Sequence, residues 1–321
     1  MDLELVSPLR GRKKEAHTAL LAQAGLADET EACRVALLWE GEQLLATGAR
    51  EGNLLKCIAV DSARQGEDLT AQILTALRED AFAEGHRHLF LYTKPRNRFL
   101  FSSLFFYPVV QTGEVLLMES RKNGIREFLA QLPPPVQGER IGAAVMNCNP
   151  FTLGHRYLIE TAAKECDHMY VFLLSEDKSE FSAHDRMEMA RLGTADFPNV
   201  TVLPTGPYLL SAATFPTYFL KERDKAQEAR CLLDIAIFEQ YFIPHFHITH
   251  RYVGTEPFSP LTALYNEALK THLTIPLREI PRLEQGGKAV SASAVRADLS
   301  QCQAMLPESS YQYLKARGLI N

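Results

Sequence analysis

The chain contains 321 residues, 46% of them hydrophobic and 23% charged, with a formal net charge of −5, a composition typical of a globular protein of about two domains. No apolar run approaches the roughly 20 residues of a membrane helix, the N-terminus lacks the pattern of a signal peptide, and no basic stripe suited to nucleic acid is visible. We therefore expect a cytoplasmic protein that binds neither membranes nor nucleic acid.

The first 132 residues are predicted to form an α+β domain. Leu69, Ile73, Leu77 and Ala81 recur at helical spacing, which predicts a helix with one buried face. Glu40-Gly41-Glu42 is typical of a turn between two strands. In chain order, the predicted elements are a helix over 10–26, strands over 34–39, 43–49 and 54–60, the helix that contains Leu69, a strand over 89–92, and then a further helix and a further strand.

The turn Ala63–Asp68 lies between the third strand and the helix that follows it. The element order resembles acetyltransferases of the GNAT superfamily, which have their pyrophosphate loop at this place, and it implies a GNAT-like domain. Ala63 stands where that loop has Gln or Arg, and Asp68 puts a negative charge where pyrophosphate would lie. The turn is interpreted either as a binding loop for a CoA-like arm or as a turn without a ligand.

A proline-rich connector divides the chain. Pro133, Pro134 and Pro135, followed by Gly138, predict a stiff extended linker over 133–139. We therefore expect two domains, over 1–132 and 140–321.

Strands and helices alternate in the second domain. Such alternation predicts an α/β fold, a doubly wound parallel sheet that binds ligands at the carboxyl ends of its strands. In chain order, strands are predicted over 141–148, 168–174, 200–203, 247–253 and 274–280, and helices over 155–166, 184–192, 217–241, 261–270, near Ser293 and near Pro307.

The first motif of this domain is Thr152-Leu153-Gly154-His155, which follows an apolar strand and opens a helix. Free backbone N–H groups and the helix dipole make such a place suitable for phosphate. We expect this imidazole to be exposed and to take part in a phosphate site. The alternative is an ordinary helix start that happens to carry a surface histidine. The motif resembles the (H/T)xGH signature of the nucleotidyltransferase superfamily, with Thr152 where many members carry the first histidine.

Two further segments resemble motifs of the same superfamily. Ser291, Ser293 and Arg296 lie at the start of the last helical part and match the motif ISSSxxR/K. The alternative is an ordinary serine N-cap followed by a solvated arginine. Lys178 and Arg186 belong to a segment like Lys-x-x-Phe-(Ser/Thr)-x-x-x-Arg, in which a solvated polar loop is the alternative for Lys178. Together the three segments predict a Rossmann-like nucleotide-binding domain.

Cysteine and histidine spacing does not favour a protein metal site. The six cysteines are scattered without a CxxC pair, which favours reduced, mostly buried thiols. His245, His247 and His250 are loosely spaced and have no carboxylate or Cys partner nearby in the sequence, so metal binding is not expected there.

The superfamily resemblance implies attack by a nucleophile on the α-phosphate of ATP. It implies catalytic roles for His155, Lys178 and Arg296, with Mg²⁺ as a counter-charge on the phosphates. The implied nucleotide-binding residues are Asn147, Asn149, Thr152, Gly154, His155, Lys178, Arg186, Gly254, Glu256, Ser291, Ser293 and Arg296.

The combination of the two halves resembles the citrate lyase ligase family over essentially the whole chain. The matching segments include 146–155, 206–208, 211–216, 251–257 and 291–296, with Thr262, Tyr265 and Asn266. The resemblance implies that acetate attacks ATP to give acetyl-AMP. The acetyl group then passes to the thiol of the phosphoribosyl-dephospho-CoA arm on the acyl carrier subunit of citrate lyase. A pantetheine-phosphate-type adenylyltransferase, an acetyl-CoA-dependent acetyltransferase and a nucleotide sensor are the alternatives.

Overall fold

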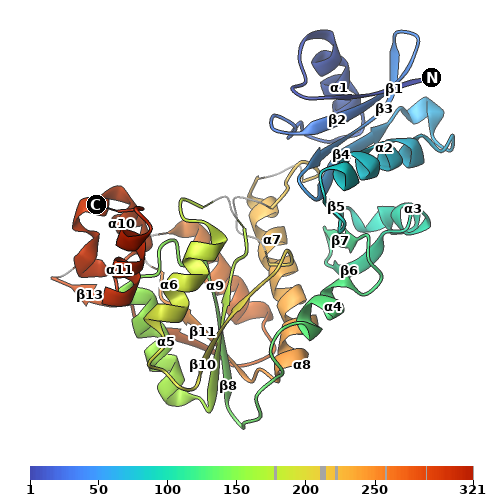
Figure 1. Cartoon of the computed structure of the whole chain (residues 1–321). Helices are drawn as coiled ribbons and strands as arrows, with labels where there is room; N and C mark the ends of the chain where they lie inside the picture. Colours follow the sequence, from blue (N-terminus) through green and yellow to red (C-terminus); the bar gives the residue numbers. More distant parts are fainter. Residues whose placement is uncertain (177–178, 210–214, 221–222, 257–258, 287, 321) are drawn as a thin grey trace. The chain divides into compact units, whose positions relative to one another are not determined.

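The structure, a computed structural model, describes the chain except for residues 177–178, 210–214, 221–222, 257–258, 287 and 321, and except for the side chains of 223–225, 261, 285, 288 and 300–302. The described residues form two compact units (Figure 1). The N-terminal unit comprises Met1–Gly124 and Pro216–Leu233, and the C-terminal unit comprises Ile125–Phe215 and Asp234–Asn321. The domain limits expected from the proline-rich connector stay a prediction.

A seven-stranded mixed sheet forms the framework of the N-terminal unit. Its strand order is β1-β2-β3-β4-β5-β7-β6, and only β4 and β5 pair in parallel. The strands are β1 (Asp2–Val6), β2 (Arg34–Glu40), β3 (Gln43–Glu51), β4 (Leu54–Val60), β5 (Phe90–Thr93), β6 (Tyr107–Gln111) and β7 (Leu116–Glu119), with helices α1 (Gly11–Gln23), α2 (Leu69–Ala83) and α3 (Arg98–Ser103).

Helix α2 packs on the sheet through the face predicted from its periodicity. Leu69, Ile73, Leu77 and Ala81 are all buried in one apolar cluster with residues of β2, β3 and β4. Gly48 of β3 lets the helix approach, because a Cβ there would lie 2.6 Å from Cγ2 of Ile73. The α+β class expected for this half is confirmed.

The C-terminal unit is built on a five-stranded sheet whose order is β10-β9-β8-β11-β12. All its strand pairs are parallel, which confirms the predicted sheet type. The strands are β8 (Ile141–Met146), β9 (His168–Leu173), β10 (Val200–Pro204), β11 (His250–Gly254) and β12 (Leu277–Ile280), and a two-stranded antiparallel pair is formed by β13 (Glu284–Gln285) and β14 (Lys288–Ala289).

Helices cover both faces of this sheet (Figure 1). On one face, α5, α6 and the C-terminal helices pack on the alternating residues that include Met146, Val171 and Tyr252. On the other face, Tyr170 and Phe172 contact aromatic rings that follow α7. The helices are α4 (Gly124–Ala130), α5 (Leu153–Glu165), α6 (Ala183–Gly193), α7 (Arg223–Ile237), α8 (Ile243–Phe246), α9 (Pro260–His272), α10 (Ala292–Ala297) and α11 (Glu308–Ala316).

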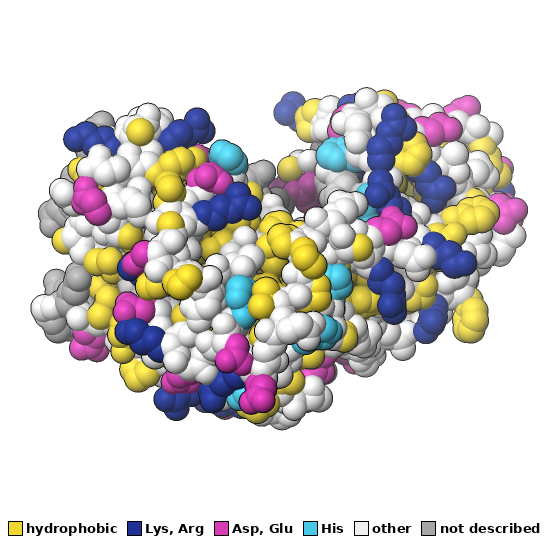
Figure 2. Space-filling model, turned by 60° about the horizontal axis from the view of Figure 1, so that its bottom comes forward, with side chains coloured by type: hydrophobic (Ala, Val, Ile, Leu, Met, Phe, Trp, Pro, Cys, Tyr) yellow, Lys and Arg dark blue, Asp and Glu magenta, His cyan; other side chains and the backbone are white. Residues whose placement is uncertain are grey.

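The helical region expected over 217–241 differs in its limits. It begins at Arg223, passes through a π-helical turn over Phe238–Phe242 and continues as α8 to Phe246. None of the helices in the described ranges has the length and apolar character needed to cross a bilayer. On the face drawn in Figure 2, Lys and Arg side chains are interspersed with Asp and Glu.

The direction of the chain through the sheet reverses between β8 and β11. From β8 the chain moves outward to β9 and β10, and it then returns to β11 on the other side of β8. Among the described residues, strands β8 and β11 pair only at Gly142–His250 and Ala143–Arg251. Their carboxyl ends therefore separate, which is the place where open parallel sheets bind ligands.

Candidate active site

A pocket of about 400 Å³ lies at this reversal point. It is bounded by the turn between β8 and α5, the end of β11, the residues after β12 and the start of α10. Most of the predicted nucleotide-binding residues line it, namely Asn147, Asn149, Thr152, Gly154, His155, Gly254, Glu256, Ser291, Ser293 and Arg296. Segments far apart in the sequence thus meet at one pocket.

The first motif forms a capped helix start. The Thr152 hydroxyl accepts a hydrogen bond from the backbone N–H of His155, and Nδ1 of His155 accepts one from the backbone N–H of Thr152 at 3.0 Å. This reciprocal arrangement is a capping box in which histidine takes the place of the usual Glu or Gln. Because Nδ1 is an acceptor here, a neutral imidazole carries its proton on Nε2.

His155 is half-buried, whereas the sequence analysis predicted an exposed imidazole. Its ring stacks on Phe151, with 5.8 Å between the ring centroids. Burial, and to a lesser extent the positive charge of Arg282, lowers the pKa of His155 to about 4. The residue is therefore a neutral hydrogen-bond donor at neutral pH, well suited to an anionic oxygen.

Gly154 allows the two main motifs to approach each other. A Cβ at this position would lie 2.8 Å from the backbone oxygen of Val290, the residue immediately before Ser291. A backbone atom cannot move aside as a flexible side chain can. The glycine of the first motif is therefore required by the close packing of the second.

The second motif caps the short helix α10. The Ser291 hydroxyl accepts a hydrogen bond from the N–H of Ala294 at 3.1 Å and lies 3.1 Å from the Ser293 hydroxyl. Arg296 is half-buried and donates to the backbone oxygen of Asn149, in the turn that leads into the first motif. The second motif is thus linked to this turn by a direct contact and to the first motif by the glycine.

Arg186 is fully buried, and its guanidinium is directed at backbone oxygens. It donates to the backbone oxygen of Asn147 at 2.9 Å, to that of Leu174 at 2.8 Å and to that of Glu176. Asn147 also accepts through its side chain at 2.7 Å. Arg186 thus holds the ends of β8 and β9 in place, and the structure does not include it among the residues that line the pocket.

The pocket contains polar residues that the sequence analysis did not assign. Arg282 follows β12, donates to the backbone oxygen of Thr255 at 2.9 Å and forms an ion pair with Glu256. Asn266 of α9 donates to the backbone oxygen of Gly254 at 3.0 Å. The signal that could have located Arg282 is its position directly after a strand of the parallel sheet.

Lys178 lies outside the described residues, so its predicted role stays a prediction. Within the described part of the chain, no group of three or more His, Cys, Asp or Glu side chains could hold a metal ion.

The N-terminal unit contains a second pocket, of about 490 Å³. Among the described residues, β5 pairs with β4 only at Leu54 and Leu55, so the rest of β4 diverges and lines the pocket. The turn Ala63–Asp68 closes one side, where Arg64 forms ion pairs with Glu40 and Glu67, each at 2.8 Å. Lys94 and Arg96 contribute further positive charge to the lining.

Several solved structures are similar to part of the chain at low sequence identity. Escherichia coli ElaA covers 38% of this chain with all of its own length, at 15% identity and a TM-score of 0.34. An acyl-CoA N-acyltransferase from Pseudomonas aeruginosa covers 38% with all of its length, at 14% identity and a TM-score of 0.33.

Curated relatives match most of the chain. The [citrate [pro-3S]-lyase] ligase of Klebsiella pneumoniae is 43% identical over 294 residues, which are 88% of this chain and 86% of that protein. The protein of the same name from Escherichia coli is 38% identical, over 85% of this chain and 82% of that protein. The one from Haemophilus influenzae is 37% identical, over 87% and 88%. The family model described as the citrate lyase ligase C-terminal domain matches residues 141–314. The chain therefore belongs to the citrate lyase ligase family.

Proposed function

We propose that the protein activates acetate with ATP and transfers the acetyl group to the thiol of the prosthetic group on the acyl carrier subunit of citrate lyase. Membership of the citrate lyase ligase family supports the overall reaction. The observation that carries the assignment of the site is the convergence of both motifs on one pocket at the reversal of the sheet.

In the first step, a carboxylate oxygen of acetate forms a bond to the α-phosphorus of ATP. The bond between that phosphorus and the oxygen bridging to the β-phosphate breaks, and pyrophosphate leaves with the bonding electrons. The protein has little covalent work in such a step, so it acts by positioning the reactants and stabilising charge.

His155 would donate from Nε2 to an oxygen on the α-phosphate, where negative charge develops. With a pKa of about 4 the imidazole is neutral at neutral pH. Its one ring proton is on Nε2, because Nδ1 accepts from the backbone of Thr152. Ser291, Ser293 and Arg296 would hold the β- and γ-phosphates as hydroxyl donors and a guanidinium. Lys178 would add a positive charge.

Mg²⁺ would reach the pocket together with the phosphates, since phosphate oxygens and water are its preferred ligands. The pocket offers hydroxyls and cations next to the phosphates, and its carboxylate Glu256 is paired with Arg282. The ion would supply counter-charge to the triphosphate, and the chain's own residues would orient the triphosphate.

In the second step, the carrier thiol loses its proton to solvent and its sulfur forms a bond to the acetyl carbon. The bond from that carbon to the AMP oxygen breaks, which gives a thioester and AMP. The pocket of the N-terminal unit is a candidate site for the carrier's CoA-like arm. An extended arm that contains amide groups could pair with the diverging part of β4.

The experiment that tests this function follows both steps with the full chain. We expect pyrophosphate release that requires acetate, then AMP release and a mass increase of one acetyl group on the thiol form of the carrier subunit. Pyrophosphate release that requires pantetheine phosphate instead would favour an adenylyltransferase. Acetylation that requires acetyl-CoA and no ATP would favour an acetyltransferase.

A further inference from the structure

Arg251 is a buried cation in the lining of the pocket at the reversal point of the parallel sheet. Its side chain is 1% exposed, and it lies at the last position where β11 pairs with β8. Two of its nitrogens, Nε and Nη1, are buried without a hydrogen-bond partner in the part of the chain that the structure describes. The residue therefore lies at the base of the crevice that opens between the two strands.

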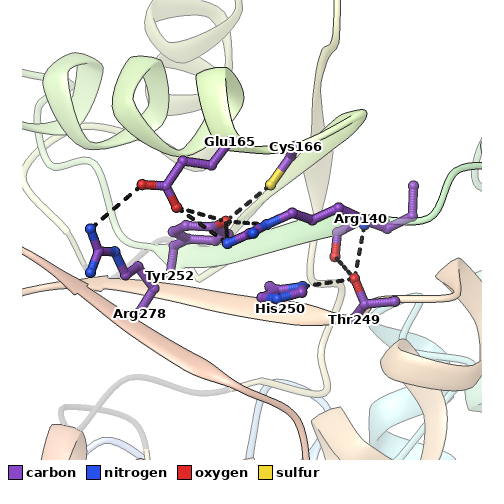
Figure 3. Close-up of polar contacts among 8 residues, drawn as sticks. Arg140, Glu165, Cys166, Thr249, His250, Tyr252 and Arg278 are labelled. Atoms are coloured by element: carbon purple, nitrogen blue, oxygen red, sulfur yellow. Dashed lines mark hydrogen bonds and ion pairs between the residues drawn. The ribbon is translucent and has the colours of Figure 1, made fainter.

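The side chain of Arg251 points to the face of the sheet opposite α5. Its neighbour Tyr252 points toward α5, where Cys166 and Arg140 donate to its hydroxyl and Glu165 accepts from it (Figure 3). Successive side chains of a strand point to opposite faces. In agreement, the Arg251 guanidinium lies 4.5 Å from the ring centroid of Phe238, beyond the end of α7.

The protein compensates the charge of Arg251 only in part. The guanidinium donates to the hydroxyl of Tyr265, which in turn donates to Asp234. One carboxylate thus balances the charge through a shared hydroxyl, while two N–H-bearing nitrogens are left without acceptors among the described residues. A buried donor without an acceptor is costly, and a charged one more so. An anion at the base of the crevice would supply an acceptor.

We propose that Arg251 binds the carboxylate of the acid substrate at the base of the crevice, with Val145 and Val253 beside the methyl group. Both valines line the same pocket. This inference rests on the proposed function, because it assigns the place of the acid in the same reaction. A carboxylate held there would have its second oxygen available for attack on the α-phosphate.

The surroundings favour a small carboxylate over a phosphate as this anion. The hydroxyls and the cation assigned to the phosphates belong to α10 and its N-cap residue, whereas Arg251 faces the region of Phe238 and Tyr265. A single guanidinium that already interacts with Asp234 suits a singly charged carboxylate better than a phosphate that carries two negative charges. Aromatic rings and valines suit a ligand that is half apolar.

The test compares acetate with acetamide, its neutral isostere. ATP–pyrophosphate exchange gives the KM for acetate, and competition against acetate gives the inhibition constant of acetamide. In Arg251→Met we expect the KM for acetate to rise ~10- to 100-fold, the range for loss of a charged hydrogen bond. The inhibition constant of acetamide and the calorimetric affinity for ATP should change less than about threefold. General damage to the fold would weaken all three alike.

Arg78→Met is the matched control. Arg78 is another arginine beside a phenylalanine ring, with a buried Nε that has no hydrogen-bond partner among the described residues, and it belongs to the N-terminal unit. Its replacement should leave the KM for acetate unchanged. Arg251→Lys keeps the charge with less risk to folding, and it should raise the KM for acetate by roughly tenfold, less than Arg251→Met does.

Each outcome bears on the proposal. An unchanged KM for acetate in Arg251→Met, or a loss of ATP affinity with acetate unaffected, would overturn it, the second result pointing to a phosphate ligand. Unfolding of Arg251→Lys would assign the residue to the fold alone and would also overturn it. Failure of the proposed function is distinguishable, because the unmodified protein would then show no acetate-dependent exchange.

Discussion

His155 combines a structural and a chemical role in one side chain. Nδ1 accepts from the backbone of Thr152 and completes the cap of α5, which leaves the Nε2 proton for a ligand. A simple truncation would remove both functions at once. Glutamine at the same position can accept from the N-cap backbone as in an ordinary capping box, so it separates the two.

We therefore predict that His155→Gln and His155→Ala both lose ~100- to 1,000-fold in acetate-dependent exchange, the cost of one transition-state donor. Only His155→Ala should also lose stability, by about 1 kcal/mol for the missing cap. Urea denaturation provides the second measurement. Exchange close to the unmodified rate in either variant would show that the imidazole is not used in catalysis.

The pKa of His155 adds a pH dependence with a definite sign. The unfolded chain gains a proton at this residue below about pH 6.5, whereas the folded chain gains it only near pH 4. The free energy of unfolding should therefore fall as the pH decreases from about 6.5 toward 4. His155→Gln should reduce that slope, and an identical slope in the variant would contradict the assigned pKa.

The loops that follow β8 and β9 are held in their conformation by hydrogen bonds from helix α6. Arg186 of α6 donates to backbone oxygens in both loops, and Asn149 accepts from the N–H of Phe181 at 3.1 Å. Asn147 and Asn149, in the turn before the first motif, are thus held in place by hydrogen bonds. Arg186 is better described as a positioning residue than as a direct ligand of the nucleotide.

Arg186→Met should lower the free energy of unfolding by about 3–5 kcal/mol, because it leaves several buried carbonyl groups without their donor. ATP affinity should fall with it as the loops lose their support. Arg191→Met on the same helix removes an arginine that is paired at 3.0 Å with Glu188 on the surface, and it should change stability by no more than about 0.5 kcal/mol. Equal stability of the two variants would refute the assignment.

The sequence predicted the elements that have strong local signals. The parallel sheet followed from alternating apolar strands and helices, and the start of α10 from Ser291 as its cap. Helix α5 begins at Leu153, two residues before the expected start, because Thr152 is its cap. The edge strand β1 was missed because its residues are mostly exposed and give little pattern. Arg186, Arg251 and Arg282 could not be told apart in the sequence, since burial and partners depend on tertiary contacts.

The division into two units has a consequence for experiments on the whole protein. Residues Pro216–Leu233 belong to the N-terminal unit, although they lie far beyond the proline-rich connector. Tyr218 is buried there and donates to the backbone oxygen of Tyr92 at 2.7 Å. A fragment that begins near Pro135 would keep this segment without its partners and expose apolar surface, so variants of the full chain are the sounder test.

The double variant Lys94→Glu with Arg96→Glu reverses two charges in the lining of the N-terminal pocket. If that pocket receives the phosphate-bearing arm of the carrier, acetyl transfer should slow by ~10-fold or more, while acetate-dependent exchange stays unchanged. Lys14→Glu with Arg10→Glu makes the same charge change at exposed residues at the start of α1, and it should affect neither step. Transfer at the unmodified rate in the pocket variant would leave the N-terminal unit without a role in binding the arm.

We propose that the pocket at the reversal of the parallel sheet joins ATP to acetate. ATP–pyrophosphate exchange by the full chain, measured with and without acetate and in the absence of any carrier protein, tests this directly. We expect exchange that requires acetate and that falls ~100- to 1,000-fold in His155→Gln. Exchange that is independent of acetate, or that requires a phosphate-bearing acceptor in its place, would contradict it.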